Sequence, residues 1–423
     1  METLEQQWGK LIKYTRQQKK LKQDDVAFGI CTPSYLSRIE NGIVIAEYAL
    51  YEQLFNRLSI SLTETMQQEQ HFLQEYEVIY EKLLSNDSLS EEEIKLLQAY
   101  EQTFQLFDHQ LIAKLIYCRY LLSIKQDEMA RSILNELEPF IPYNTDRMTS
   151  LYIAITAFAH LSFLEFNQLA DREHNNFNAQ LLIRASDFEQ ANYHYHVAFA
   201  NHRSYQFQKA LDHIELATNH ISHLFKPLFQ LKLYSMKGVI FNDLNRFNEA
   251  LNEYNAGLNL LNHVPSIQTP MQFSSIYNNI AYCYECQKDF EKACKHYALA
   301  QHYEHDLHSV INWMRTCYQL QDFTQLNELL NKYDKAQFFV THHLHQRALL
   351  AYACEKEYSI SSLKQLEEQA FPHFEQQQYF ALTLFYAPLW AGFYENLHAY
   401  KQASNCYQLA LQASEKIRER MSR

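Results

Sequence analysis

The chain has 423 residues, with 37 Lys and Arg against 49 Asp and Glu and a net charge of −12. It holds only six glycines and eight prolines beside 47% hydrophobic residues, which predicts an all-α protein of two or more domains with short connections. So few glycines argue against a glycine-rich phosphate loop, and neither a nucleophile elbow nor an HExxH motif occurs. We therefore expect a binding protein and not an enzyme, with no cofactor and no metal.

The sequence shows no sign of export or membrane insertion. No apolar segment follows Met1, and nowhere do about 18 uncharged apolar residues run together. The eight cysteines are scattered over apolar helix faces, which fits reduced thiols. We expect a cytoplasmic protein that does not contact a membrane.

The first predicted domain, residues 1–62, is a small helical bundle. Its apolar side chains recur at helical spacing: Leu11, Leu21, Val26, Ala27, Ile30, Leu36, Ile39, Leu50, Leu54 and Leu58. Within it, residues 21–42 read LKQDDVAFGICTPSYLSRIENG. Thr32-Pro33 is a helix start, with a hydroxyl N-cap and Pro at the first helical position, and Asn41-Gly42 is a stop. The segment therefore predicts a short helix between two defined ends.

This segment resembles the helix-turn-helix of the Xre DNA-binding family. The resemblance implies that double-stranded DNA is a partner and that Gln23 braces a phosphate and the recognition helix. The residues that it places toward the major groove are Thr32, Ser34, Tyr35, Ser37 and Arg38. The sequence departs from the commonest family form at Asp24-Asp25, where Glu is more usual, and at the long Phe28.

Charge is concentrated beside this motif. Residues 1–60 hold eight Lys and Arg and seven Asp and Glu, a net +1, and six of the eight cations lie at positions 10–22. They form one local patch for phosphates, although a run of lysines is also typical of any solvated helix face. A domain of charge +1 implies modest affinity, and hence a homodimer or higher homo-oligomer on paired half-sites.

Residues 63–110 are predicted to form a helical connector. They hold two helical patterns that a turn at residues 85–88 divides, and Ser90 followed by three glutamates is a helix start. The segment lacks Gly and Pro, so we do not expect a flexible linker.

Residues 111–423 are predicted to be a repeat array that ends in a capping helix. A small or apolar residue recurs at intervals near forty residues, at Ala130, Ala170, Ala210, Ala250, Ala293, Leu326, Leu363 and Ala403. The units at Ala170 and Leu363 match poorly. The unit at 231–261 matches best, with Gly238 and Gly257 permitting close helix approach and Tyr254 filling the gap. These spacings resemble the tetratricopeptide repeat, which implies a right-handed superhelix with a concave groove.

Several polar residues fall on positions that face the groove in that frame. Asn279 and Asn312 occupy the same position in successive repeats, where peptide-binding arrays often carry an Asn that grips a ligand's main chain. Arg315, one turn beyond Asn312, is placed to meet a ligand carboxylate. The further candidates are His196, Asn242 and Tyr352. The alternative is that all six are ordinary polar groups on a wet surface.

One cysteine and histidine group resembles a zinc set. Cys283 and Cys286, with Cys294 and His296, have suitable residue types, but no second CxxC or HxxxH pair closes the site. The repeat pattern already accounts for the two cysteines, so we expect no metal there.

An Xre-type helix-turn-helix followed by such an array resembles the RRNPP family of peptide-responsive quorum-sensing regulators. The segment at 191–217 is similar to the repeats of Rap proteins, and the length and repeat number are most like the NprR branch. The resemblance implies a transcription regulator switched by a short signalling oligopeptide, of roughly five to eight residues, in the groove. Two alternatives stay open: a Rap-like protein that binds a response regulator, and a repressor controlled by a protein partner or by none.

Overall fold

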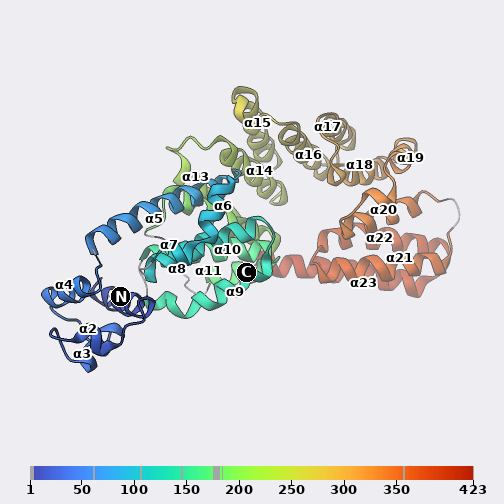
Figure 1. Cartoon of the computed structure of the whole chain (residues 1–423). Coiled ribbons are helices and arrows are strands. Elements are labelled where there is room, and N and C mark those ends of the chain that lie inside the picture. The colour runs from blue at the N-terminus through green and yellow to red at the C-terminus, as the bar shows by residue number, and fades with distance from the viewer. Residues whose placement is uncertain are drawn as a thin grey trace. The chain divides into compact units, whose positions relative to one another are not determined.

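The computed structural model describes residues 4–60, 62–104, 107–143, 146–174, 182, 184–355 and 358–422. Within these ranges every regular element is a helix, which confirms the all-α class (Figure 1). None of the helices in that part of the chain is long and apolar enough to cross a membrane. By internal contacts the chain falls into two units, Met1–Ala200 with Asn219–Leu224, and Asn201–Thr218 with Phe225–Arg423. The boundary between these two units falls within residues 111–423, the predicted repeat array. It therefore matches neither of the two boundaries between the three predicted domains.

The first four helices form a bundle with its own core. They are α1 (Leu4–Gln18), α2 (Gln23–Ala27), α3 (Pro33–Glu40) and α4 (Tyr48–Arg57). All ten predicted apolar residues belong to this core, with Leu21, Ile30 and Leu50 at its edge. Trp8 adds an aromatic contact, because its ring centroid lies 5.2 Å from that of Tyr51. A Cβ on Gly9 would lie 2.1 Å from the Ile39 carbonyl oxygen, so this glycine lets α1 pack directly on α3.

The predicted connector is helical where the structure describes it. It comprises α5 (Leu62–Ser85), α6 (Glu91–Gln98) and α7 (Tyr100–Thr103), and residues 105–106 of the predicted range lie outside the described residues. Ser90 caps α6 as predicted, since its hydroxyl accepts from the Glu93 N–H at 3.2 Å. Arg147 ties α5 to the repeats: its Nε donates to Glu77 Oε1 at 2.8 Å and its NH1 to Glu189 Oε1 at 2.8 Å.

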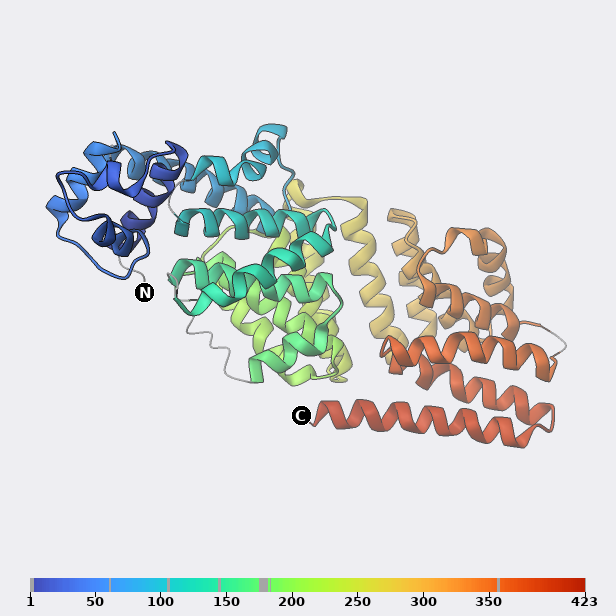
Figure 2. The same ribbon diagram turned by 60° about the horizontal axis from the view of Figure 1, so that its bottom comes forward.

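Paired helices follow as the repeat array. They are α8 (Phe107–Ser123), α9 (Asp127–Leu137), α10 (Asp146–Ser162), α11 (Phe166–His174), α12 (Asp187–Arg203), α13 (Phe207–Ile221), α14 (Pro227–Asp243), α15 (Phe247–His263), α16 (Pro270–Cys286), α17 (Phe290–Tyr303), α18 (Leu307–Leu320), α19 (Phe323–Lys332), α20 (Thr341–Ala353), α21 (Ile360–Gln376), α22 (Phe380–Asn396) and α23 (Tyr400–Met421), with short 3₁₀ turns at Glu138–Tyr143, Pro265–Ile267 and Lys335–Gln337. In the second unit, α21, α22 and α23 lie side by side (Figure 2).

The predicted repeat register is confirmed. All eight marker residues are buried on the second helix of a pair, and each is the fourth residue of its helix, or the fifth in α11. Of the two poor matches, Leu363 obeys the fourth-residue rule and Ala170 is displaced by one, and both are buried. In the best unit, a Cβ on Gly238 would lie 2.4 Å from the Tyr254 ring, so α14 and α15 touch at backbone distance there.

The turns inside the repeats use left-handed residues that are not glycine. The residue two positions before the second helix has a positive φ in seven pairs: Lys125, Leu164, Tyr205, Asn245, Lys288, Gln321 and His398. Of these types Asn and His adopt this conformation most readily, so the other five turns carry backbone strain at regular places.

Candidate DNA-binding and ligand-binding sites

The recognition helix α3 begins and ends where the sequence predicts. Thr32 is its N-cap, with Oγ1 accepting from the Tyr35 N–H at 3.2 Å, and Gly42 past its end has φ +67°. Leu36 and Ile39 are fully buried against the bundle. On the other side, Thr32, Ser34 and Arg38 are exposed, and Tyr35 and Ser37 are half-buried. The predicted groove-facing residues thus share the accessible side of α3.

A buried carboxylate holds α3 in place from its last residue. Glu40 is 1% exposed and accepts from Arg16 Nε at 2.6 Å, from Arg16 NH2 at 2.9 Å and from Gln23 Nε2 at 2.8 Å. The hydrogen bond that Arg16 donates to Glu40 raises the pKa of Arg16. Gln23 therefore braces the recognition helix, as the resemblance implies, and it does so through Glu40.

The basic patch is smaller than the sequence count suggests. Arg16 forms an ion pair with Glu40. Lys13 Nζ donates to Asn41 Oδ1 at 2.8 Å, at the end of α3. Lys19 reaches the Leu58 carbonyl oxygen. Lys20 and Lys22 are exposed beside this set. Part of the predicted phosphate patch is therefore the scaffold that orients α1, α3 and α4.

In the second unit, a buried ion pair joins the first helices of two successive repeats. Glu285 on α16 accepts from Arg315 Nε at 2.7 Å, from Arg315 NH2 at 2.9 Å and from the Tyr297 hydroxyl at 2.9 Å. Burial lowers the pKa of Arg315, but Glu285, Tyr297 and Tyr282 together raise it by more, so the pKa lies well above its ordinary value. Asn242 on α14 donates from Nδ2 to the neighbouring Cys286 Sγ at 3.3 Å. Arg315, predicted to meet a ligand, is mostly engaged by its own chain.

A second polar row runs parallel to the first. Asn312 Nδ2 donates to Asn278 Oδ1 at 3.3 Å, and Asn278 Nδ2 donates to Asn279 Oδ1 at 3.4 Å. The row continues through His308, whose Nδ1 lies 3.1 Å from His343 Nε2 on α20. Asn312 and Asn279 are thus connected through Asn278, a residue that the sequence reasoning missed. Because Asn278 and Asn279 are adjacent, the sequence does not show which of them meets Asn312. Only the packing of α18 against α16 decides between them.

The remaining two candidates are placed apart from these rows. His196, in the first unit, is 7% exposed, with its ring centroid 5.2 Å from that of Phe158. Tyr352 is 6% exposed in the hydrophobic core, and its hydroxyl oxygen accepts from the Ser359 N–H at 3.1 Å. Tyr352 therefore fixes the start of α21, a position that differs from the expected groove-facing one.

Sequence reasoning missed three residues that organise these sites: Glu40, Asn278 and Glu285. Each is a polar side chain on an otherwise buried helix face. The sequence does show a glutamate or asparagine one position off the apolar stripe of a helix, which indicates a buried polar contact. It does not show the partner, because the partner lies on another helix.

The helix-turn-helix and the whole chain each match known proteins. Residues 12–64 match the family HTH_3, described as helix-turn-helix. The chain is similar to "Transcriptional activator NprA" of Geobacillus stearothermophilus, with 20% identity over 416 residues, covering 92% of this chain and 98% of that protein. One relative of nearly equal length therefore matches both the helix-turn-helix region and the repeat array.

Solved structures share the fold. The apo form of the quorum sensor NprR from B. thuringiensis has a TM-score of 0.65 at 15% identity, covering 82% of this chain and 99% of its own. A Rap protein complexed with competence and sporulation factor has a TM-score of 0.65 at 14% identity, covering 84% and 99%. NprR in complex with its cognate peptide NprX has a TM-score of 0.57 at 15% identity, covering 81% and 99%. The chain thus joins a helix-turn-helix of the HTH_3 family to the fold of NprR and Rap, which confirms the predicted resemblance to the RRNPP family at its NprR branch.

Proposed function

We propose that this protein is a transcription regulator that binds DNA through α3 and is switched by a short peptide held in its repeats. The observation that carries the proposal is the pairing of an exposed recognition helix with an array whose fold a solved peptide complex shares. Such a regulator binds the peptide with one part of the chain and its DNA operator with another.

On the DNA side, Thr32, Ser34, Tyr35, Ser37 and Arg38 make the groove contacts and Gln23 positions them. Arg38 is the strongest candidate for a base contact, because it is exposed and has no ion-pair partner among the described residues. A guanidinium can donate two parallel hydrogen bonds to guanine, which discriminates it from other bases. The phosphate contacts fall to exposed lysines such as Lys20 and Lys22.

On the peptide side, the two polar rows of the second unit are the proposed contact surface. Asn279 is half-buried, and its amide Nδ2 has no partner among the described residues. That group is available to a ligand's main-chain carbonyl oxygen. Asn242 Oδ1 is buried and has no hydrogen-bond partner in the described part of the chain, so a peptide N–H would supply the donor that it lacks there. We propose Asn312 and Arg315 as supporting residues, because they join the first helices α16 and α18. His196, in the first unit, and Tyr352, which fixes the start of α21, are not part of this surface.

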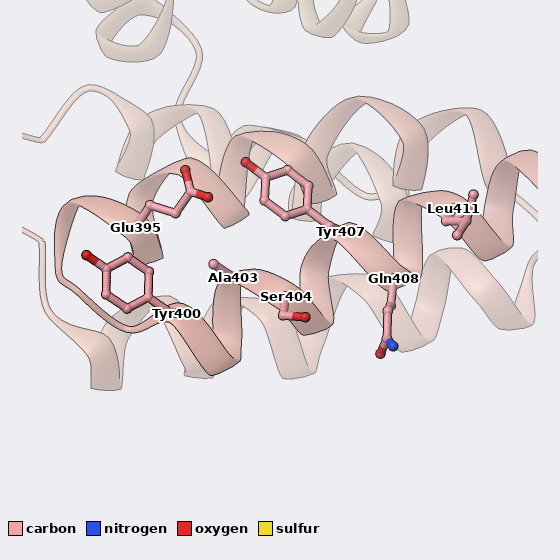
Figure 3. A pocket seen from close by; sticks show the side chains of 7 residues that line it. All are labelled: Glu395, Tyr400, Ala403, Ser404, Tyr407, Gln408 and Leu411. Carbon is pink, nitrogen blue, oxygen red and sulfur yellow. The ribbon is translucent and has the colours of Figure 1, made fainter.

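We also propose that the regulator works as a homo-oligomer. A pocket of about 390 Å³ lies on the outer face of α22 and α23, lined by Glu395, Tyr400, Ala403, Ser404, Tyr407, Gln408 and Leu411 (Figure 3). A repeat face that is left in water is normally polar, whereas Tyr400 is 64% and Leu411 59% exposed here. A second copy on this face would cover them and pair the DNA-binding domains.

One experiment separates the two binding activities. DNA from upstream of the gene is titrated by fluorescence anisotropy, with and without a synthetic peptide encoded by a neighbouring short reading frame. We expect Arg38→Ala to lower specific DNA affinity by roughly tenfold or more while peptide affinity by calorimetry is unchanged. Asn279→Ala should do the reverse.

The control is Lys335→Ala, an exposed lysine of the second unit, which should alter neither affinity. Specific DNA binding that survives Arg38→Ala unchanged would contradict the assigned recognition helix. Full peptide affinity in Asn279→Ala would contradict the assigned peptide contact.

A further inference from the structure

A second pocket, in the second unit, has a chemistry that selects its occupant. It encloses about 300 Å³, on the order of ten water molecules at ~30 Å³ each. Three first helices, α16, α18 and α22, contribute most of its wall, and Phe290 at the start of α17 also lines it. The apolar part consists of Tyr282, Phe290, Ala381, Leu382 and Phe385. The polar part consists of Glu285, Cys286, Lys288, Arg315 and Gln319.

The charges of this pocket do not cancel. Glu285 is largely engaged, because it already accepts two hydrogen bonds from Arg315 and one from Tyr297. The Arg315 NH1 group makes neither of these hydrogen bonds to Glu285. Nor is it one of the buried side-chain atoms that have no hydrogen-bond partner among the described residues. Lys288 lines the same pocket, is exposed, and has no ion-pair partner among the described residues. Among the lining residues Arg315 and Glu285 balance, so Lys288 leaves the lining one unit positive. Burial, and with it Asp243, raises the pKa of Tyr282 and of Cys286, so Asp243 acts on the same lining from outside it, and its carboxylate is hydrogen-bonded to His202 at 2.6 Å.

The pocket also contains an acceptor without a donor. Gln319 Oε1 is buried and has no hydrogen-bond partner among the described residues. A buried carbonyl oxygen that gives up water without gaining a donor destabilises the free protein, so a ligand N–H at this place gains affinity. The pocket therefore offers cationic N–H donors, one neutral acceptor and aromatic walls.

We propose that this pocket is the selectivity subsite of the peptide receptor, and that it holds a carboxylate carried by an apolar stretch of peptide. The inference rests on the proposed function. Arg315 NH1 and Lys288 Nζ bind the carboxylate, Gln319 accepts from a main-chain N–H, and Phe385 and Leu382 contact the apolar side chain. The carboxylate comes either from an Asp or Glu side chain or from the peptide's C-terminus.

The test uses three libraries of N-acetylated hexapeptides and the full-length protein. The first library has a free C-terminus and no Asp or Glu, the second has an amidated C-terminus and one Asp or Glu, and the third is amidated with neither. Retention is measured by equilibrium dialysis and mass spectrometry. We expect the first or the second library to be retained about tenfold better than the third, and the preferred one identifies the source of the carboxylate.

Variants at Lys288 test the site without disturbing the buried ion pair. Lys288 has φ +62°, which Asn adopts readily, so Lys288→Asn removes the charge and keeps the turn. It should lower the carboxylate preference about fivefold. Lys288→Glu should turn the preference toward peptides that carry Lys or Arg. Lys335→Asn, at another exposed lysine of the same unit, should leave the preference unchanged.

The outcomes distinguish the subsite from the proposed function. Equal retention of all three libraries, or a carboxylate preference that Lys288→Glu leaves intact, overturns the subsite while peptide binding stands. No retention of any library overturns peptide binding itself, and the subsite with it.

Discussion

Glu285 shows how one buried residue supports the second unit. Its carboxylate is 6% exposed and takes hydrogen bonds from two other helices, from Tyr297 on α17 and Arg315 on α18. We expect Glu285→Ala to lower the free energy of unfolding by about 3–5 kcal/mol, because Arg315 would remain buried without a counter-charge. Urea denaturation followed by circular dichroism measures this loss.

The matched control for this change is Glu253→Ala, since Glu253 pairs with Lys237 at 3.4 Å on a partly exposed surface. That variant should cost no more than about 1 kcal/mol. Replacing both Glu285 and Arg315 with Met should recover much of the loss, because neither charge is then buried alone. If Glu285→Ala and Glu253→Ala were equally mild, the ion pair would not hold the repeats together.

His343 makes stability depend on pH. Burial, and then the neighbouring His308, lower the pKa of His343 to about 4, which Asp306 opposes only in part. The unfolded chain, with an ordinary pKa of about 6.5, takes up this proton first, so stability is present above pH ~6.5 and is lost as the pH falls toward ~4. The loss approaches about 1.4 kcal/mol per pH unit in that window. Thermal unfolding of His343→Gln between pH 7 and 5 should show a shallower decline than the native chain, whereas exposed His305→Gln should not.

At the scale of the helix pair, the turns carry strain that a substitution can remove. Leu164 has φ +60° and is 66% exposed, so its side chain contributes little burial while its backbone is in an unfavourable region. Left-handed backbone costs ~1–2 kcal/mol for such a residue, and glycine regains part of this after its larger entropy loss. We expect Leu164→Gly to stabilise the protein by ~0.5–1 kcal/mol and Leu164→Ala to leave it nearly unchanged. Calorimetric melting temperatures of the three proteins check this, and a lower value for the glycine variant would contradict it.

The helix pairs were predictable from the sequence because one requirement repeats. Each second helix needs a small or apolar residue where it approaches its partner, and the eight markers from Ala130 to Ala403 follow from that need alone. The ends of α3 were predictable for a similar reason, since Thr32 and Gly42 satisfy local backbone demands.

The contacts between polar groups of different helices were not predictable. Asn312 meets Asn278 and not Asn279, and Arg315 is held by Glu285, because of how far α18 is rotated against α16. Periodicity gives the face of a helix but not its rotation to within one residue. The same limit applies to Arg16, which the charge count assigned to DNA and the packing assigns to Glu40.

At the scale of the whole molecule, charge supports the proposal that control lies in the pairing of copies. Residues 1–60 carry a net +1 and the rest of the chain carries −13. A single DNA-binding domain thus gains little from phosphate neutralisation, and the acidic array opposes its approach to DNA. Two domains held together gain from each other, since the second binds at a high effective concentration once the first is in place. A signal that changes how copies pair therefore changes DNA affinity steeply.

The outer face of α23 is where we expect that pairing to occur, and Leu411→Lys tests it. Leu411 is 59% exposed beside the pocket that Tyr407 and Tyr400 line, so a lysine there leaves the fold intact but puts a charge into any interface. We expect light scattering to show a smaller assembly than for the native chain, with specific DNA affinity lower by tenfold or more and peptide affinity unchanged. Leu164→Lys, at a residue of similar exposure in the first unit, should leave the mass unchanged. An unchanged mass for Leu411→Lys would place the pairing surface elsewhere, whereas a smaller mass with full DNA affinity would show that one domain suffices and that charge does not set the need for two.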